Sequence, residues 1–306
     1  GGPQVWLAHS KVCELHSRHG PGPSFALRLD QVLEQGAIAA RVGEHDVTIA
    51  KAQGEVMPLA DSETVCVAVM PRFWVMNHLW CDLQVQQAQA EATPRAGCVT
   101  NVPAHRGVPV HLAAAEEPPA IVLRPAGGEE EGSWSGAVGL CGERRCSLAL
   151  QGGGLPAEGA VWVEVVRQPT GQLVLHVSSG EAAEFHVENH THMALLVRQF
   201  NVERSTVRVP PLSAKPFSWY DPLEMARCAG AGRHAALQLR SERWRLSDWL
   251  ALDPYGPCRC SARHGDTTLY AHTRREGGTH VVAVTLSQHI EAWHEPNYVD
   301  ARAAAA

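Results

Sequence analysis

Histidine and cysteine are the residues whose chemistry stands out in this 306-residue sequence, which contains 17 of the first and nine of the second. Imidazole and thiolate groups are the ligands that zinc prefers in proteins. Six of them could be assembled into a site: His186, His190, His192, Cys258, Cys260 and His264. Structural zinc sites use cysteines about two to four residues apart, whereas Cys258 and Cys260 are separated by one residue. We therefore expect no metal and no cofactor.

Catalytic motifs are equally scarce. The sequence has no GxSxG nucleophile elbow, no HExxH and no GxGxxG following an expected strand. The acidic run 129–131 lies in a Gly-containing segment typical of a solvated loop. No spacing rule brings His105 and His111 together with Asp82. We expect no enzymatic activity.

The elements that must position these residues are indicated by an internal repeat. Segments 71–87 and 183–199 carry the same residue at seven of 17 positions when the second is placed 112 residues after the first. All shared residues except one histidine pair have the same parity, so a strand places them on one half-buried face. The sequence therefore predicts two copies of one β-sheet module in tandem. The pairs are Phe73 and Phe185, Val75 and Val187, Asn77 and Asn189, His78 and His190, Leu83 and Leu195, Val85 and Val197, and Gln87 and Gln199.

The order of patterns continues downstream in both copies. The segments GVPVH, AIVLR and SWS follow the first, and KPFSW, ALQLR and SDW follow the second. Each copy closes on a hairpin pattern, at 161–177 and 267–283, where a polar Gly-containing turn separates two β-branched runs. A period of about 110 residues suits whole β-domains better than short solenoid repeats. We expect a partly ordered flanking segment at 1–65, β-sandwich modules at 66–180 and 181–288, and a further module start or disordered tail at 289–306.

Composition places the chain in the all-β class. Its 27 Gly and 20 Pro suit short strands joined by turns, and only 30–42 and 246–252 resemble helices. A formal charge of −6 and a pI near 6.3 argue against a nucleic-acid partner, which requires clustered basic residues. No apolar run is long enough to span a membrane, and the start has no signal-peptide pattern.

The cysteines also bear on the compartment. Nine is an odd number, and their irregular spacing favours reduced thiols and a cytosolic location. The segment Asn189-His190-Thr191 has the N-glycosylation pattern, but it falls in an expected inward-facing strand. We interpret this pattern as chance.

Asn77 and Asn189 are the polar residues at the centre of the repeat. They share the parity of its apolar positions, so each amide is predicted to point into the core, where an unpaired polar group costs about 1–3 kcal/mol. An amide can bridge a turn or strand end with two donors and two acceptor lone pairs. Two interpretations stay open: a structural tie at a strand corner, or an amide that also supports a peptide-binding edge.

Four tryptophans have defined places in this pattern. Trp134 and Trp249 follow the Leu-Arg strand of each copy and are expected in the module cores. Trp74 and Trp80 have the parity of the outer face. Exposed aromatics would mark an interface, while burial against a neighbouring module or the N-terminal segment would give the same parity.

The second copy resembles a known family. A strand ending in Asn189, a short break, an apolar run ending in Arg-Gln, and then PPLSAKPFSWYDP are similar to the adaptor-binding region, or SHR-binding domain, of the vacuolar protein sorting thirteen family of bridge-like lipid transfer proteins. The most specific residues are Pro216, Trp219, Asp221 and Pro222. Segment 267–286 is similar to the module end of that family, and the first copy resembles it more loosely. The resemblance covers roughly 66–288.

The resemblance implies a non-catalytic interaction module. In that family six β-sandwich modules, each with one asparagine matching Asn77 and Asn189, bind Pro-X-Pro segments of adaptors and so place the protein at organelle membranes or contact sites. This chain holds two modules and not six, and the family's lipid-conducting groove is absent from it. The expected partners are proline-rich adaptor proteins, with membranes reached only through the full-length protein. The candidate site residues are Asn77, Asn189, Pro216, Trp219, Asp221 and Pro222.

Two other function classes remain. An extracellular β-sandwich that binds carbohydrate would use the exposed tryptophans and the glycosylation pattern. A zinc-dependent enzyme would use the histidines and cysteines. Glycan binding would indicate the first class, and metal analysis would decide the second.

Overall fold

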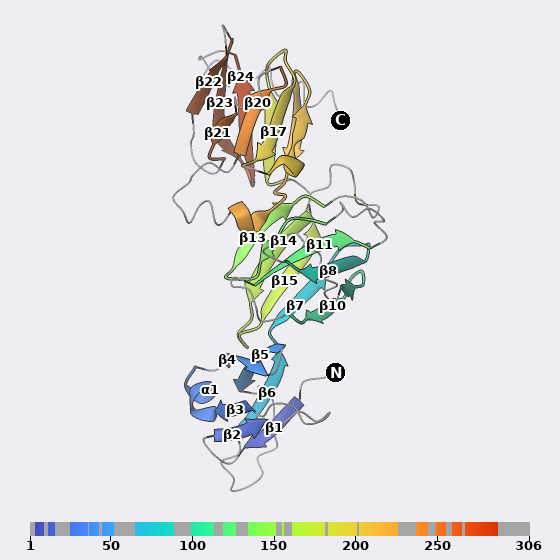
Figure 1. Ribbon diagram of the computed structural model, residues 1–306, viewed down its shortest axis with the longest axis vertical. Coiled ribbons are helices and arrows are strands. Elements are labelled where there is room, and N and C mark those ends of the chain that lie inside the picture. Colours follow the sequence, from blue (N-terminus) through green and yellow to red (C-terminus); the bar gives the residue numbers. More distant parts are fainter. Residues whose placement is uncertain are drawn as a thin grey trace. The chain divides into compact units, whose positions relative to one another are not determined.

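In a computed structural model the described residues are mostly in β-strands, and the chain divides into two compact units, residues 1–180 and 181–306. Each unit is described by itself below (Figure 1). The structure describes residues 4–8, 12–15, 25–35, 37–42, 45–51, 65–88, 99–112, 119–126, 134–150, 155, 161–180, 183–200, 202–225, 237–243, 249–254, 259–264 and 267–286. The expected tail at 289–306 lies outside this range.

The first unit begins with a four-stranded antiparallel sheet. Its order is β1 (Gln4–Ala8), β6 (Val65–Pro71), β5 (His45–Lys51) and β4 (Ala37–Val42). A two-stranded sheet of β2 (Val12–Leu15) and β3 (Phe25–Arg28) precedes the helix α1 (Leu29–Gln35). Residues 66–71, expected in the first module, belong to this sheet. The helix expected at 30–42 ends at Gln35, and its second half is β4, because Gly36 disfavours a continuous helix.

The rest of the first unit, from Phe73 onward, is a β-sandwich, here called the first sandwich. Its five-stranded sheet has the order β10 (Gly107–Val110), β7 (Phe73–Asn77), β15 (Leu173–Ser179), β14 (Val161–Arg167) and β13 (Arg144–Leu148). Its four-stranded sheet has the order β12 (Val138–Gly139), β11 (Ala120–Pro125), β8 (Leu83–Gln87) and β9 (Thr100–Val102). The hairpin predicted at 161–177 is confirmed as β14 and β15.

The second unit is a β-sandwich as well, here called the second sandwich. Its five-stranded sheet has the order β19 (Ser213–Phe217), β16 (Phe185–Asn189), β24 (Thr279–Thr285), β23 (Thr267–Glu276) and β22 (Arg259–His264). Its four-stranded sheet has the order β18 (Val207–Val209), β17 (Leu195–Gln199), β20 (Leu237–Ser241) and β21 (Leu250–Leu252). The second predicted hairpin is confirmed as β23 and β24. The end of the helix-like segment 246–252 is β21.

Strand order and register agree between the two sandwiches. In each, the first strand of the repeat pairs in parallel with the last strand of the module, inside an otherwise antiparallel sheet. The predicted inward face of the repeat is also present, since Phe73, Val75, Phe185 and Val187 are buried. Whether the two sandwiches superpose closely stays a prediction. The register can be followed along one row of paired residues across neighbouring strands. In the first sandwich this row is Cys146, Val163, Val177 and Asn77, and the equivalent row in the second is Cys260, Ala271, Val284 and Asn189.

Each sandwich changes sheet at two corners near its asparagine. After β7 the chain leaves the five-stranded sheet for β8, and after β9 it returns to β10. The second sandwich does the same between β16 and β17, and again between β18 and β19. The returning corners contain His105 (φ 56°) and Leu212 (φ 50°), two non-glycine residues in the left-handed region. The corners therefore hold a demanding backbone conformation that needs support.

Candidate functional site

The Asn77 amide ties together the two corners of the first sandwich. Its Nδ2 donates to the carbonyl oxygens of Cys81 at 2.9 Å, Val102 at 3.1 Å and Pro103 at 3.2 Å. Its Oδ1 accepts from the backbone N–H of Leu79 at 3.0 Å. The first and last contacts lie in the outgoing corner, and the other two lie where β9 turns back. The predicted inward orientation and backbone hydrogen bonds are confirmed.

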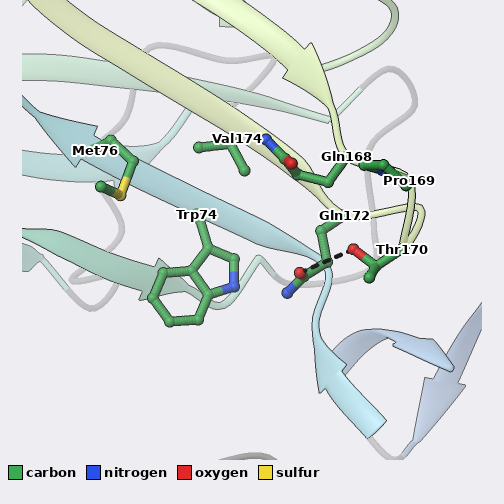
Figure 2. A pocket seen from close by; sticks show the side chains of 7 residues that line it. All are labelled: Trp74, Met76, Gln168, Pro169, Thr170, Gln172 and Val174. Carbon is green, nitrogen blue, oxygen red and sulfur yellow. Dashed lines mark hydrogen bonds between the residues drawn. The ribbon is translucent and has the colours of Figure 1, made fainter. Parts of the chain in front are cut away.

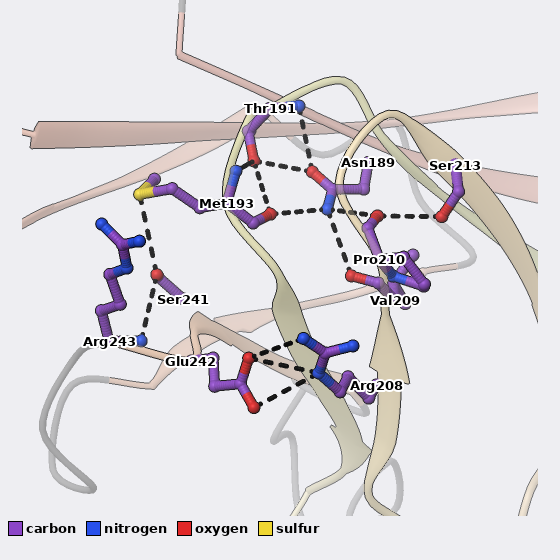
Figure 3. A network of polar contacts seen from close by, with 10 residues as sticks. All are labelled: Asn189, Thr191, Met193, Arg208, Val209, Pro210, Ser213, Ser241, Glu242 and Arg243. Atoms are coloured by element: carbon purple, nitrogen blue, oxygen red, sulfur yellow. Dashed lines mark hydrogen bonds and ion pairs between the residues drawn. The ribbon is translucent and has the colours of Figure 1, made fainter.

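Asn189 makes the same set of contacts in the second sandwich (Figure 3). Its Nδ2 donates to the carbonyl oxygens of Met193 at 2.8 Å, Val209 at 3.2 Å and Pro210 at 2.8 Å. Its Oδ1 accepts from both the backbone N–H and the hydroxyl of Thr191, at 3.0 and 2.7 Å. In both sandwiches the amide thus donates to the carbonyl four residues later in the sequence. It also donates to the carbonyls of a consecutive Val and Pro at the end of β9 in the first sandwich and of β18 in the second.

Both amides are buried, with 1% of each residue exposed, and their donor and acceptor groups already have backbone partners. They therefore stabilise the corners and cannot touch a ligand directly. The same geometry bears on the glycosylation pattern, because the Asn189 Nδ2 atom that would carry a glycan is enclosed by three carbonyl oxygens. Glycosylation there requires the second sandwich to be unfolded.

The other candidate residues lie in one structural segment of the second sandwich. Pro216 lies on the edge strand β19, opposite His186. Trp219 is wholly buried, and its ring meets that of Phe185 edge-on with centroids 5.0 Å apart. Pro222 is buried at the start of a helical turn, and Asp221 Oδ1 accepts from the backbone N–H of Glu224 at 2.9 Å. These residues close the module, and the structure does not bring them together as an exposed site.

Gln199 holds this closing segment in place, a role that the sequence did not suggest. Its Oε1 accepts from the backbone N–H groups of Tyr220 at 3.1 Å and Asp221 at 2.9 Å, and its Nε2 donates to the Asp221 carbonyl at 2.6 Å. Gln199 is the last shared residue of the repeat and has inward parity. The same argument that demanded partners for the asparagines could have identified it.

Trp134 and Trp249 are not core residues, contrary to expectation. Both are half-buried, and each ring is covered by an arginine guanidinium. Arg124 lies 4.4 Å from the Trp134 centroid, and Arg240 and Arg198 lie 4.9 and 4.1 Å from that of Trp249. Arg124 alternates with buried Leu123 on β11, so this contact is on the outer face of the four-stranded sheet. Such cation–π pairs contribute about 0.5–1 kcal/mol when exposed.

Glu188, Arg274 and His190 form an ionic cluster on the outer face of the second five-stranded sheet. Glu188 Oε2 lies 2.8 Å from Arg274 Nη2 and 3.1 Å from His190 Nε2, and its side chain is only 2% exposed. Burial acts to raise the pKa of the Glu188 carboxyl, but the hydrogen bonds from His190 and Arg274 outweigh it and lower the pKa to about 2. Glu188 is therefore an ionised, paired carboxylate rather than a proton donor.

In the part of the chain that the structure describes, the histidines and cysteines do not converge. Within the described ranges no three His, Cys, Asp or Glu side chains are grouped as they would be around a metal ion. His186, expected to face solvent, is half-buried, whereas His192 is exposed as expected. His105, His111 and Asp82 are all exposed, and Asp82 Oδ1 accepts from the backbone N–H of Ala104 at 2.8 Å, a structural turn contact. Residues 129–131 and Cys258 lie outside the described ranges.

Comparisons with known proteins add little. No protein-family profile matches the chain, and no curated protein matches it. Two crystal structures of the pilus adhesin SpaC from Lactobacillus rhamnosus GG align with 81% of this chain, at 8% and 9% identity and TM-scores of 0.26 and 0.25. The aligned region is 32% of the adhesin, so this chain spans about a third of it. At such scores the alignment assigns neither fold nor function.

None of the helices in the described part of the chain has the length and apolar character needed to cross a membrane.

Proposed function

We propose that this chain is a non-catalytic interaction module of a bridge-like lipid transfer protein, recruited to organelle membranes or contact sites by proline-containing adaptor peptides. The observation that carries the proposal is the pair of buried asparagines, Asn77 and Asn189, each of which donates to three carbonyl oxygens at the corners of its sandwich; we call this arrangement the asparagine clamp. It occurs in both sandwiches, which have the same strand order. One asparagine at this place in every module is one part of the resemblance to the vacuolar protein sorting thirteen family, whose most specific residues here are Pro216, Trp219, Asp221 and Pro222.

The physical reason for a proline-containing ligand is its low conformational entropy. Such a segment is already extended, so little freedom is lost when it docks on a groove or strand edge. Edge strands β10 and β19 carry Pro109 and Pro216 at matching places, opposite Trp74 and His186. A proline on an edge removes the N–H that an added strand would use. A side-chain groove therefore suits recognition better than strand addition at these two edges.

Peptide titration tests the proposal. The 306-residue chain would be titrated calorimetrically with a capped Pro-X-Pro peptide and its Ala-X-Ala counterpart. We expect a Kd of about 1–100 μM for the first, because one short segment buries little area. Binding should vary little with salt, since the chain has a net charge of −6 and no basic cluster. Equal heats from both peptides, or none at millimolar concentration, would contradict the proposal.

A further inference from the structure

The outer face of the first five-stranded sheet carries a pocket of about 400 Å³ (Figure 2). Trp74 and Met76 of β7 and Val174 of β15 form its apolar floor. The turn between β14 and β15 forms its wall. The lining residues are Trp74, Met76, Gln168, Pro169, Thr170, Gln172 and Val174, and none of them is ionisable.

The wall is a turn braced by its own hydrogen bonds. Gly171 N donates to the Gln168 carbonyl and Gln168 N to the Gln172 carbonyl, both at 2.8 Å, with Gly171 at φ 82°, which favours glycine. The Gln172 side chain donates to the Pro71 carbonyl at 2.9 Å and accepts from the Thr170 hydroxyl at 3.2 Å. A wall fixed in this way loses little entropy when a ligand binds.

The corresponding place in the second sandwich is built differently. His186 replaces Trp74, Glu188 replaces Met76 and Arg274 replaces Val166, as the shared register shows. The turn there has only two residues, Gly277 and Gly278, against five in the first sandwich. The ionic cluster occupies the face where the first sandwich has an apolar floor. The pocket is therefore a feature of the first sandwich that the shared fold does not require.

One buried polar group of the pocket has no partner among the described residues. The Trp74 indole nitrogen is shielded from solvent and has no hydrogen-bond partner in the described structure, and Figure 2 shows it on the side of the ring that faces Gln172. Because the nitrogen is shielded, the ring or the Gln172 side chain must shift before a ligand acceptor can reach it. Buried donors are normally satisfied, so that contact would remove the cost of an unpaired N–H.

We propose that this pocket holds a proline ring of the adaptor peptide against Trp74, whose indole N–H donates to a peptide carbonyl. The neutral lining selects an uncharged segment, because a charged group would lose its hydration without gaining a partner. Aromatic-lined grooves bind proline-rich segments in this manner. This inference rests on the proposed function and assigns recognition to the first sandwich.

Three variants of the full chain test the assignment with the capped Pro-X-Pro peptide. Trp74→Phe keeps the ring and removes the donor, so we expect binding about 3–10-fold weaker, the effect of one hydrogen bond. Met76→Glu introduces the residue of the second sandwich, and we expect a loss of at least about tenfold. The control is Trp80→Phe, because Trp80 is 51% exposed and outside the pocket, and it should bind as the parent does. Circular dichroism checks that each variant is folded.

The outcomes separate the two proposals. Wild-type affinity in both Trp74→Phe and Met76→Glu would overturn the pocket and leave the proposed function intact. If the peptide does not bind the parent chain, the proposed function fails, and the pocket is tested alone with N-acetylproline methylamide. The readout is the indole N–H resonance of Trp74, identified by its loss in Trp74→Phe. A shift of that resonance supports the pocket, and an unchanged resonance at millimolar concentration overturns it.

Discussion

Single buried amides determine the corners of both sandwiches. Asn77 and Asn189 each satisfy three carbonyl oxygens that belong to two separate chain reversals. Alanine would remove the side-chain donor from all three carbonyls of each corner pair and the acceptor from the buried N–H of Leu79 or Thr191. The carbonyls of Pro103, Met193 and Pro210 would keep one other donor each. One side chain thus supports two sheet changes, which explains why a polar residue occupies an otherwise apolar face.

We predict that Asn77→Ala and Asn189→Ala each lower the free energy of unfolding by about 1–3 kcal/mol, the cost of leaving buried polar groups unpaired. Urea denaturation measures the change. Asn101→Ala is the control, because Asn101 is exposed and, among the described residues, its side chain has one hydrogen bond, accepted from Gln84 Nε2 at 3.1 Å. That variant should stay within about 0.5 kcal/mol of the parent. Equal stability of all three variants and the parent would show that the clamps are dispensable.

The Glu188 cluster predicts a dependence of stability on pH. The folded pKa of about 2 lies below the ordinary value of 4.5, so the stability it contributes is complete above pH 4.5 and is lost as the pH falls toward 2. Glu188→Gln removes this titration. The difference in unfolding free energy between parent and variant should therefore be largest near pH 6 and shrink at pH 3. A difference that is constant over this range would show that Glu188 titrates normally.

Residue parity is a sound guide to orientation where the residue belongs to a strand. Asn77 and Asn189 terminate strands, so their inward direction followed from the alternation. Trp134 precedes β12 and Trp249 precedes β21, so alternation along β11 or β20 says nothing about either ring. Their arginine partners come from other strands, and a pairing register is needed to find them. Gln199 could have been predicted from parity, but its partners at 220 and 221 could not.

At the level of elements, the closing segment of the second sandwich depends on a clamp of its own. Gln199 on β17 fixes the backbone of Tyr220 and Asp221, just after the edge strand β19. This contact positions buried Trp219 against the core. The segment that carried the family resemblance is thus a structural closure in this protein.

We predict that Gln199→Ala loosens this segment. Loss of the three hydrogen bonds should increase amide hydrogen exchange at Tyr220 and Asp221 and lower the free energy of unfolding by about 1–3 kcal/mol. Glu203→Ala serves as the control, because the Glu203 side chain is 91% exposed and its long ion pair with Arg198, at 3.9 Å, contributes little to stability. Unchanged exchange at residues 220 and 221 in Gln199→Ala would refute the clamp.

Hairpins and inward faces were predictable because they depend on local alternation and turn composition. The boundary of the first sandwich was not, because β6 continues almost directly into β7 with only Arg72 between them. Both strands are apolar, and their assignment to different sheets depends on partners far away in sequence. The pocket was also invisible to sequence, since it combines β7 with a turn about 95 residues later.

For the whole molecule, the compact units 1–180 and 181–306 imply separable stability. Each sandwich has its own asparagine clamp and its own buried core. Domains with separate cores commonly unfold in separate steps, so a single free energy of unfolding or Tm for the whole chain is not well defined. This property allows each clamp to be assigned to its unit.

We predict that calorimetry of the 306-residue chain shows at least two unfolding transitions, and that Asn77→Ala and Asn189→Ala shift different ones. A loss of about 1–3 kcal/mol in a domain of this size lowers its Tm by several degrees, which calorimetry resolves.

The transition lowered by Asn189→Ala should be the one that moves with Glu188→Gln, because both residues lie on β16. The transition lowered by Asn77→Ala should be the one that a bound Pro-X-Pro peptide raises, since ligand binding stabilises only the unit that holds the site. A single transition shifted equally by both asparagine variants would show that the units unfold as one, and a peptide that raises only the Asn189 transition would move recognition to the second sandwich.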